Sequence, residues 1–260
     1  MRYSSRLAAA STLIIAFATA GAFAEGVSIS EANVKELEAG DVIKVSKIPD
    51  GVYLRKVNDP DDAIWERLPE YRVRLALAPP VHESVELRIG DDDQAQDVYL
   101  NLARTSDRFY VRMRWRDDTR DVETLHDRFR DGAAVQFSLG TDETSPIMGT
   151  GPDEPVNIWY WRPDNGSVSS LAAGGPGSTT ILEDQPVSGS SRYDAAEGNA
   201  AGVWTVVMSR PIAAAGEHQV SLERDSVPLG FALWQGSTEQ RDGFKTVSDG
   251  WIIADMTDPS

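Results

Sequence analysis

The chain has 260 residues, of which 41 are acidic and 25 are lysine or arginine, so its formal net charge is −16, and it contains no cysteine. Such an acidic surface argues against binding to nucleic acid or to an anionic membrane; it suits a basic partner protein, or simply keeps the chain soluble. The absence of cysteine excludes disulfides, thiolate metal sites and haem attached through thioether bonds.

The first 24 residues have the three-part pattern of a secretory signal. Arg2 and Arg6 give a positive start, residues 7–17 form an apolar run without acidic residues, and Ala22-Phe23-Ala24 is a small-residue cleavage site. A short membrane anchor is the alternative, but the run is too brief for a good spanning helix. We therefore expect residues 1–24 to be removed and residues 25–260 to form a single soluble domain outside the cytoplasm and outside any membrane.

The rest of the chain reads mainly as short strands. A helix-like or irregular stretch occupies residues 30–37, and a Gly-, Ser- and Pro-rich stretch at residues 172–199 is expected to be a long loop. The remaining runs alternate polar and apolar residues, which is typical of half-buried antiparallel strands. Strands are expected at residues 71–77, 86–89, 97–102, 108–115, 133–139, 156–161, 202–208, 229–235 and 251–254. We predict an all-β fold, an antiparallel β-sandwich with short helical segments.

Motifs for catalysis are missing from the sequence. There is no G-x-S-x-G elbow and no P-loop, and the many carboxylates single out no catalytic pair. The three histidines, His82, His126 and His218, are far apart and lack metal-ligand spacing. The motifs therefore assign no catalytic reaction to this chain.

Lys245 is unusual because the long stretch of sequence around it uses arginine, not lysine, for its positive charges. From residue 57 onward the chain has 17 arginines but only this one lysine. Lysine can lose its proton when it is buried or bound to a metal, whereas arginine cannot. Lys245 is thus a candidate neutral amine ligand, and a solvated lysine that escaped a compositional bias is the alternative.

Met148 and the aromatic residues after it form a second candidate site. Met148 lies in a loop rich in proline and glycine, from which a thioether can reach into a cavity; packing in the core or at the surface is the alternative. The strand at residues 156–161 carries Trp159 and Trp161, which suit the wall of a flat hydrophobic cofactor, although aromatic residues on strands are commonly core residues.

Four stretches in order resemble the γ subunits of the periplasmic molybdenum enzymes related to dimethyl sulfoxide reductase, a group that includes the ethylbenzene, dimethyl sulfide, selenate and chlorate enzymes. Together these stretches place the resemblance over roughly residues 65–256. The stretches are PIMG at 146–149 with PVNIWYW at 155–161, DRFRDGAAVQF at 127–137, WTVVMSRP at 204–211, and FALWQG at 231–236 with RDGFKTVS at 241–248.

The resemblance implies a β-sandwich that holds one non-covalent haem b with methionine and lysine as axial ligands. Carried over by motif, these ligands are Met148 and Lys245, with Trp159 and Trp161 near the haem and Arg162 as a candidate partner of a propionate. His126 is the reserve ligand. The implied function is electron transfer in the periplasm, between the iron–sulfur β subunit of a complex and a soluble c-type cytochrome. The α subunit of such a complex carries the molybdenum, so the resemblance implies that this chain is not an enzyme by itself.

Two other functions fit the same fold class. A carbohydrate-binding β-sandwich module shares the architecture and the aromatic strand. A free-standing haem sensor is a further alternative, although a lipoprotein form would require a cysteine that the chain lacks. Fold alone does not choose among these functions.

Overall fold

The computed structural model describes residues 29–50, 58–80, 83–86, 94–126, 128–198, 200–213 and 216–258. The expected signal at residues 1–24 lies outside this part of the chain. Within it, no helix is both long enough and apolar enough to cross a membrane. The strands are β1 (Lys35–Leu37), β2 (Val42–Lys44), β3 (Ser46–Lys47), β4 (Tyr71–Leu77), β5 (Gln96–Arg104), β6 (Arg108–Arg116), β7 (Gly132–Ser138), β8 (Val156–Trp161), β9 (Val168–Ala173), β10 (Thr180–Ile181), β11 (Ser188–Asp194), β12 (Val203–Pro211), β13 (Ser226–Trp234), β14 (Thr246–Ser248) and β15 (Ile252–Asp255).

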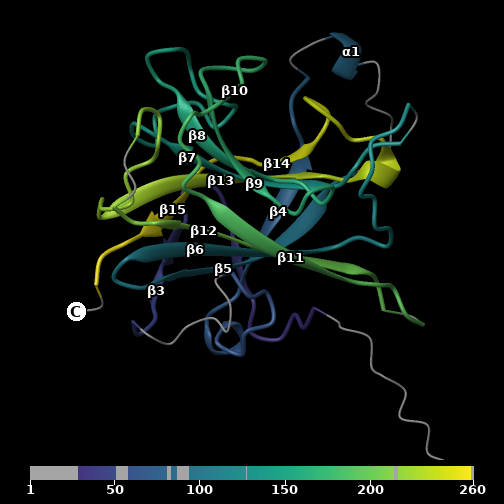
Figure 1. Ribbon diagram of the computed structural model, residues 1–260, viewed down its shortest axis with the longest axis horizontal. Coiled ribbons are helices and arrows are strands. Elements are labelled where there is room, and N and C mark those ends of the chain that lie inside the picture. The colour runs from purple at the N-terminus through teal and green to yellow at the C-terminus, as the bar shows by residue number, and fades with distance from the viewer. Residues whose placement is uncertain are drawn as a thin grey trace, which may run out of the picture.

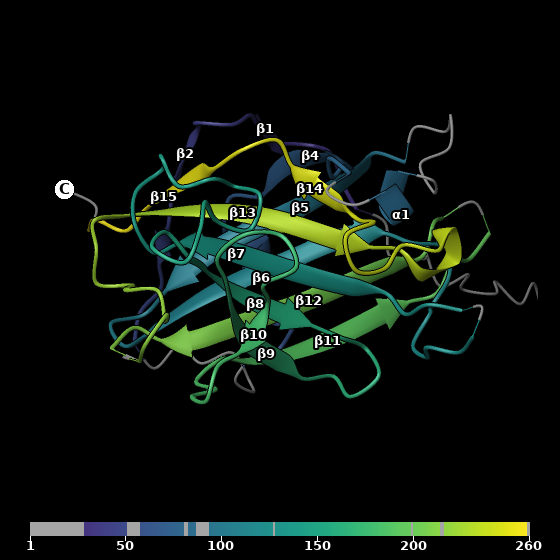
Figure 2. The ribbon, with the colours of Figure 1, turned by 90° about the horizontal axis from the view of Figure 1, so that it is seen from above.

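The strands form one continuous sheet that folds over itself into two layers (Figure 1). The order is β10-β9-β8-β7-β13-β14-β4-β5-β6-β12-β11, and the pairs along this path are antiparallel. Strands β7, β8, β9 and β13 make the first layer, and β5, β6, β11 and β12 make the second. Seen from above, β7 and β13 lie across β6 and β12 (Figure 2). The predicted all-β antiparallel sandwich is confirmed.

The core lies between the two layers, because alternate residues of each strand point inward. On β8 the inward residues are Trp159 and Trp161, and on β6 they include Met113 and Trp115; all are almost completely buried. The ring of Trp161 lies 5.0 Å from that of Trp204 on β12 and 6.0 Å from that of Trp115. Large aromatic side chains thus fill the space between the layers.

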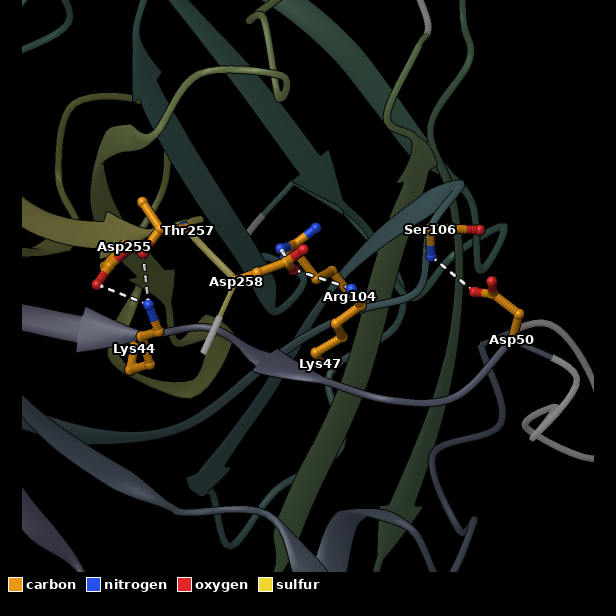
Figure 3. Close-up of polar contacts among 8 residues, drawn as sticks. All are labelled: Lys44, Lys47, Asp50, Arg104, Ser106, Asp255, Thr257 and Asp258. Atoms are coloured by element: carbon orange, nitrogen blue, oxygen red, sulfur yellow. Dashed lines mark hydrogen bonds and ion pairs between the residues drawn. The ribbon is translucent and has the colours of Figure 1, made fainter. Parts of the chain in front are cut away.

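Exposed ion pairs join the N-terminal strands to the C-terminal end of the described chain (Figure 3). Lys44 on β2 lies 3.0 Å from Asp255 on β15, and Lys47 on β3 lies 3.0 Å from Asp258, which also pairs with Arg104 on β5. Strand β2 runs parallel to β15, and β3 runs parallel to β5. The ion pairs therefore accompany backbone pairing that already holds this edge, and exposed pairs of this kind add little stability themselves.

Three expectations about local structure were wrong in whole or in part. Residues 30–34 are irregular, which is one of the two expected forms, but Lys35–Leu37 is strand β1, which pairs with β4. The run at 86–89 is not a strand at its described end, because Glu83–Glu86 is a short helix, α1, and residues 87–89 lie outside the described chain. The expected loop at 172–199 contains β10 and β11, and β11 pairs with β12 over seven residues. The other short helical segments are η1 (Trp65–Arg67) and η2 (Gly236–Thr238).

Candidate functional site

An apolar cavity opens on the outer face of the first layer, where small side chains leave room above the sheet. About 1040 Å³ of space free of protein atoms lies within and in front of it, open solvent at its mouth included. Its wall on β4, β7, β8, β13 and β14 includes Ala76, Ala134, Ile158, Gly230, Ala232 and Val247. The strands therefore provide a broad apolar surface rather than a polar catalytic cleft.

Met148 enters the cavity from the loop between β7 and β8, and its backbone is held in a left-handed conformation with φ of 62°. Such a conformation costs about 1–3 kcal/mol in a residue other than glycine and occurs at ligand clamps. Gly149 follows with φ of 91°, and a Cβ there would lie 2.8 Å from the carbonyl oxygen of Glu154. The amide of Gly175 donates a 2.7 Å hydrogen bond to the Met148 carbonyl. The loop is thus built tightly around the position of the thioether.

Lys245 enters the cavity from the turn before β14. Its carbonyl accepts a 2.8 Å hydrogen bond from the amide of Ala78, which fixes the backbone beside the sheet. Its ammonium lies 4.9 Å from the centre of the Trp234 ring. Burial lowers the pKa of Lys245 to about 8, against a smaller opposing effect of Asp242. The neutral amine is therefore much more accessible near neutral pH than in an ordinary lysine.

The structure brings Met148 and Lys245 together from positions 97 residues apart in the chain. Lys245 Nζ lies 3.8 Å from Met148 Sδ, and both side chains line the same cavity. A thioether is only a weak acceptor, so this contact by itself contributes little stability. A thioether sulfur and an amine nitrogen that meet beside an apolar cavity can instead both bind one metal ion. No group of three or more histidine, aspartate or glutamate side chains offers a competing metal site in the described residues.

Trp159 and Trp161 do not line this cavity. Both side chains are fully buried between the layers, on the opposite face of β8 from Ile158, which is part of the cavity wall. The alternation of side chains along a strand places them there, so the expectation that they form a cofactor wall at this site is corrected. Their indole nitrogens have no hydrogen-bond partner among the described residues.

Arg162 and His126 are also outside the cavity. Arg162 follows β8 and its Nε lies 3.6 Å from Asp164 at the surface. His126 is exposed in the loop between β6 and β7. Neither residue is brought to Met148 or Lys245, so neither is retained at this site.

Two aromatic residues beside the cavity were missed by the sequence analysis. Trp234, at the end of β13, lines the cavity, and its ring lies 5.1 Å from that of Tyr160 on β8. Its indole nitrogen donates a 3.1 Å hydrogen bond to the Asp242 carbonyl, which ties it to the turn that carries Lys245. Strand alternation separates Tyr160 from the core-facing Trp159 and Trp161 on β8, and Trp234 from the core-facing Leu233 on β13, but it does not tell which face of a strand meets a cavity.

The carbohydrate-binding alternative receives no support from the surface. The exposed large hydrophobic side chains of the described residues are aliphatic, and the aromatic ones there are buried or half-buried. An open aromatic platform on which a sugar ring could stack is therefore absent from the part of the chain that the structure describes.

Comparison with known proteins decides the family. The family model described as ethylbenzene dehydrogenase matches residues 62–196, which is just over half of the chain. The dimethylsulfide dehydrogenase subunit gamma of Rhodovulum sulfidophilum is 56% identical over 230 residues, which cover 88% of this chain and 87% of that protein. This chain belongs to the ethylbenzene dehydrogenase family of molybdoenzyme gamma subunits.

Other relatives of this gamma-subunit family are more distant. The chlorate reductase subunit gamma of Ideonella dechloratans is 33% identical over 241 residues, covering 92% of this chain and 93% of that protein. A protein of Haloferax mediterranei, provisionally named a respiratory nitrate reductase heme subunit, is 37% identical over 192 residues, covering 73% of this chain and 65% of that protein. The names of the two gamma subunits place the family in multi-subunit enzyme complexes.

Proposed function

We propose that this gamma subunit binds one non-covalent haem b between Met148 and Lys245 and transfers electrons within a periplasmic molybdoenzyme complex. The observation that carries the proposal is the 3.8 Å separation of Met148 Sδ and Lys245 Nζ at the mouth of an apolar cavity. One relative is named as a heme subunit, which supports the choice of cofactor. The absence of cysteine leaves only packing and axial ligation to hold a haem in this chain.

The residues present fit a haem in their chemistry. The apolar wall matches a flat hydrophobic ring. Thioether sulfur is an established haem ligand, and the amine nitrogen of lysine is a close analogue of the histidine nitrogen that also binds haem iron. Haem supplies one-electron redox chemistry, and a thioether ligand raises the reduction potential in cytochromes. No residue of the cavity forms a nucleophile–base pair, which is consistent with a subunit that carries electrons rather than one that performs catalysis.

Lys245 must lose a proton before its nitrogen can bind a metal. Burial lowers its pKa to about 8, so removing that proton near neutral pH costs less free energy than in an ordinary lysine. Trp234 and the apolar wall exclude water from the amine, and the left-handed backbone of Met148 directs the thioether to the same space. These features give each ligand a defined position before the cofactor enters.

The proposed partners follow from the family. An α subunit with the molybdenum site would perform the substrate chemistry, an iron–sulfur β subunit would exchange electrons with this chain, and a soluble c-type cytochrome would be the outer electron carrier. The strongly acidic chain suits a basic carrier through electrostatic steering.

The test is the haem content of the full chain expressed with sufficient haem. We expect one haem b per chain, extractable with acidified solvent because no thioether bond holds it, and a redox change when the loaded chain is mixed with a c-type cytochrome. A purified chain that retains no haem, or that exchanges no electrons once loaded, contradicts the proposal.

A further inference from the structure

Two of the four exposed large hydrophobic side chains among the described residues lie at or near the mouth of the cavity. The described residues include four exposed large hydrophobics: Val42, Leu125, Ile147 and Ile181. Ile147 precedes Met148 and lines the cavity. Ile181 on the edge strand β10 is opposite Leu171, which is opposite the wall residue Ile158, so all three side chains share the outer face. At the usual strand spacing, Ile181 lies about 10 Å from Ile158.

The loop that carries Met148 to this mouth has several exposed carboxylates without ion-pair partners among the described residues. The loop that carries Met148 contains Asp142, Glu143, Asp153 and Glu154, all exposed. No lysine, arginine or histidine occurs from residue 137 to residue 161, and none of these four carboxylates forms an ion pair with the described residues. Asp249, also exposed, is part of the cavity wall itself.

Local structure holds this charge close to the cavity. The amide of Thr150 donates to the Glu154 carbonyl at 3.2 Å, and Gly149 packs against that carbonyl, so Glu154 lies directly beside the methionine turn. Arg224 contacts the base of the loop, where it donates a 2.6 Å hydrogen bond to the Gly140 carbonyl. Since one guanidinium contacts the base of a loop that has four carboxylates, the loop keeps a negative net charge.

Unpaired charges around an apolar centre are typical of transient recognition. The centres of permanent interfaces are depleted of charged residues, whereas oppositely charged rims speed encounter and fix orientation. We infer that the acidic mouth, defined as Ile147, Ile181 and the loop acids Asp142, Glu143, Asp153 and Glu154, is the docking surface for a basic electron-carrier protein. This inference rests on the proposed function, since a redox cofactor in the cavity is what a carrier would approach here.

The test compares two variants with equal changes in charge. Glu143→Gln/Glu154→Gln removes two charges at the acidic mouth. Glu66→Gln/Glu197→Gln removes two exposed charges from η1 and from the turn between β11 and β12, both associated with the second layer. Each haem-loaded chain is reduced and mixed in a stopped-flow instrument with oxidised, basic mitochondrial cytochrome c. We expect the second-order rate constant of the first variant to fall about three- to tenfold at about 10 mM ionic strength, and the difference to shrink below about twofold at about 0.5 M.

At about 0.1 M ionic strength, where charges more than about 10 Å apart are largely screened, the control variant should keep the rate constant of the unmodified chain within about 1.5-fold while the first variant stays slower. Equal effects of the two variants, with unaltered haem spectra, overturn the docking surface but leave the proposed function intact. A chain without haem overturns both. A first variant that loses copurifying subunits while its salt dependence stays unchanged identifies a permanent interface instead and also overturns the inference. Ile181→Ser should lower the rate constant at both salt concentrations. An unchanged rate constant would show that Ile181 is not part of the docking surface.

Discussion

At the scale of single residues, Lys245 is the most informative side chain, because the proposed cofactor binding would couple to its protonation. Its pKa of about 8 means that the amine is mostly protonated at neutral pH, and ligation must release that proton. Apparent haem affinity should therefore rise about tenfold per pH unit from about pH 6 to about pH 8 and then level off. A haem titration followed by absorption checks this, and Trp234, beside the amine, offers a fluorescence signal.

A matched variant separates this effect from other titrations. Lys245→Met supplies a ligand that carries no proton, so its haem affinity should lose the steep dependence on pH. If the variant and the unmodified chain show the same slope, the release of a proton by Lys245 is not part of binding.

A second residue-scale prediction concerns two buried carboxyls at the far end of the first layer. Asp131 accepts hydrogen bonds from the amides of Asp121 and Gly236 and from the indole of Trp204. Asp117 is 2% exposed, and one of its oxygens has no partner among the described residues. Burial and then the charge of Asp131 raise the pKa of Asp117 to about 7, and burial raises that of Asp131 to about 6.

Since these pKa values are raised on folding, the folded state binds more protons than the unfolded state between about pH 4 and about pH 7. The stability that the pair contributes is complete below about pH 4 and is lost as pH rises through about 7. Asp117→Asn should therefore stabilise the chain more at pH 8.5 than at pH 5.5, by on the order of 2 kcal/mol. Urea unfolding at the two pH values measures this; an equal change at both would show that Asp117 is not titrating in this range.

At the scale of elements, the loop between β7 and β8 requires a residue without a side chain at position 149, because of its positive φ. Substitution by alanine, which adds one methyl group, tests this requirement. Gly149→Ala places a Cβ 2.8 Å from the Glu154 carbonyl at φ of 91°. We expect a loss of about 1–2 kcal/mol of stability and faster haem dissociation, because the turn that directs Met148 must shift. Thermal unfolding and haem transfer to an acceptor protein provide the measurements.

Gly151→Ala is the matched control in the same loop, because its Cβ would meet nothing within 4 Å. It should leave both the unfolding temperature and the haem dissociation rate close to those of the unmodified chain. Equal effects of the two substitutions would show that the loop does not depend on the conformation at Gly149.

The elements also show how far the sequence alone could be interpreted. Strands with clear alternation, such as β4, β6 and β8, were predicted close to their observed bounds, because one face is buried and the other is less so. Strand β11 was missed since its Ser-Gly-rich sequence has low strand propensity, and pairing with β12 overrides that propensity.

The candidate site was predictable only in part. The compositional exception of Lys245 and the loop position of Met148 selected two side chains that the fold brings together. Sequence gave no means to tell which face of β8 would meet the cavity, so Trp159 and Trp161 were chosen in place of Ile158 and Tyr160. Which face is buried depends on how the sheet folds over, and that is a property of long-range pairing.

At the scale of the whole molecule, one sheet is folded into two layers (Figure 1). A buried aromatic core lies between the layers, and an apolar cavity lies on the outer face of the first layer. The donors reach the cavity from turns at the ends of strands, so the sandwich acts as a rigid support while loops supply the chemistry. Ligand binding at such a site stabilises the folded state by mass action.

Export is the other whole-molecule expectation. The mature chain should begin at Glu25, so intact mass spectrometry of protein isolated from the periplasm should show the loss of 24 residues. Retention of Met1 and the apolar run after it in the isolated protein would contradict a cleaved signal and favour an anchor.

The proposed haem site and the proposed docking surface both require that Met148 and Lys245 share one iron. The absorption spectrum of the haem-loaded chain tests it directly, with Met148→Leu and Lys245→Arg as variants of similar size that remove the thioether and the titratable amine. The unmodified chain should be low-spin, and each variant should become high-spin or change its ligand band, while Met113→Leu in the core should leave the spectrum unaltered. An unchanged low-spin spectrum in either site variant would contradict the assignment of that ligand.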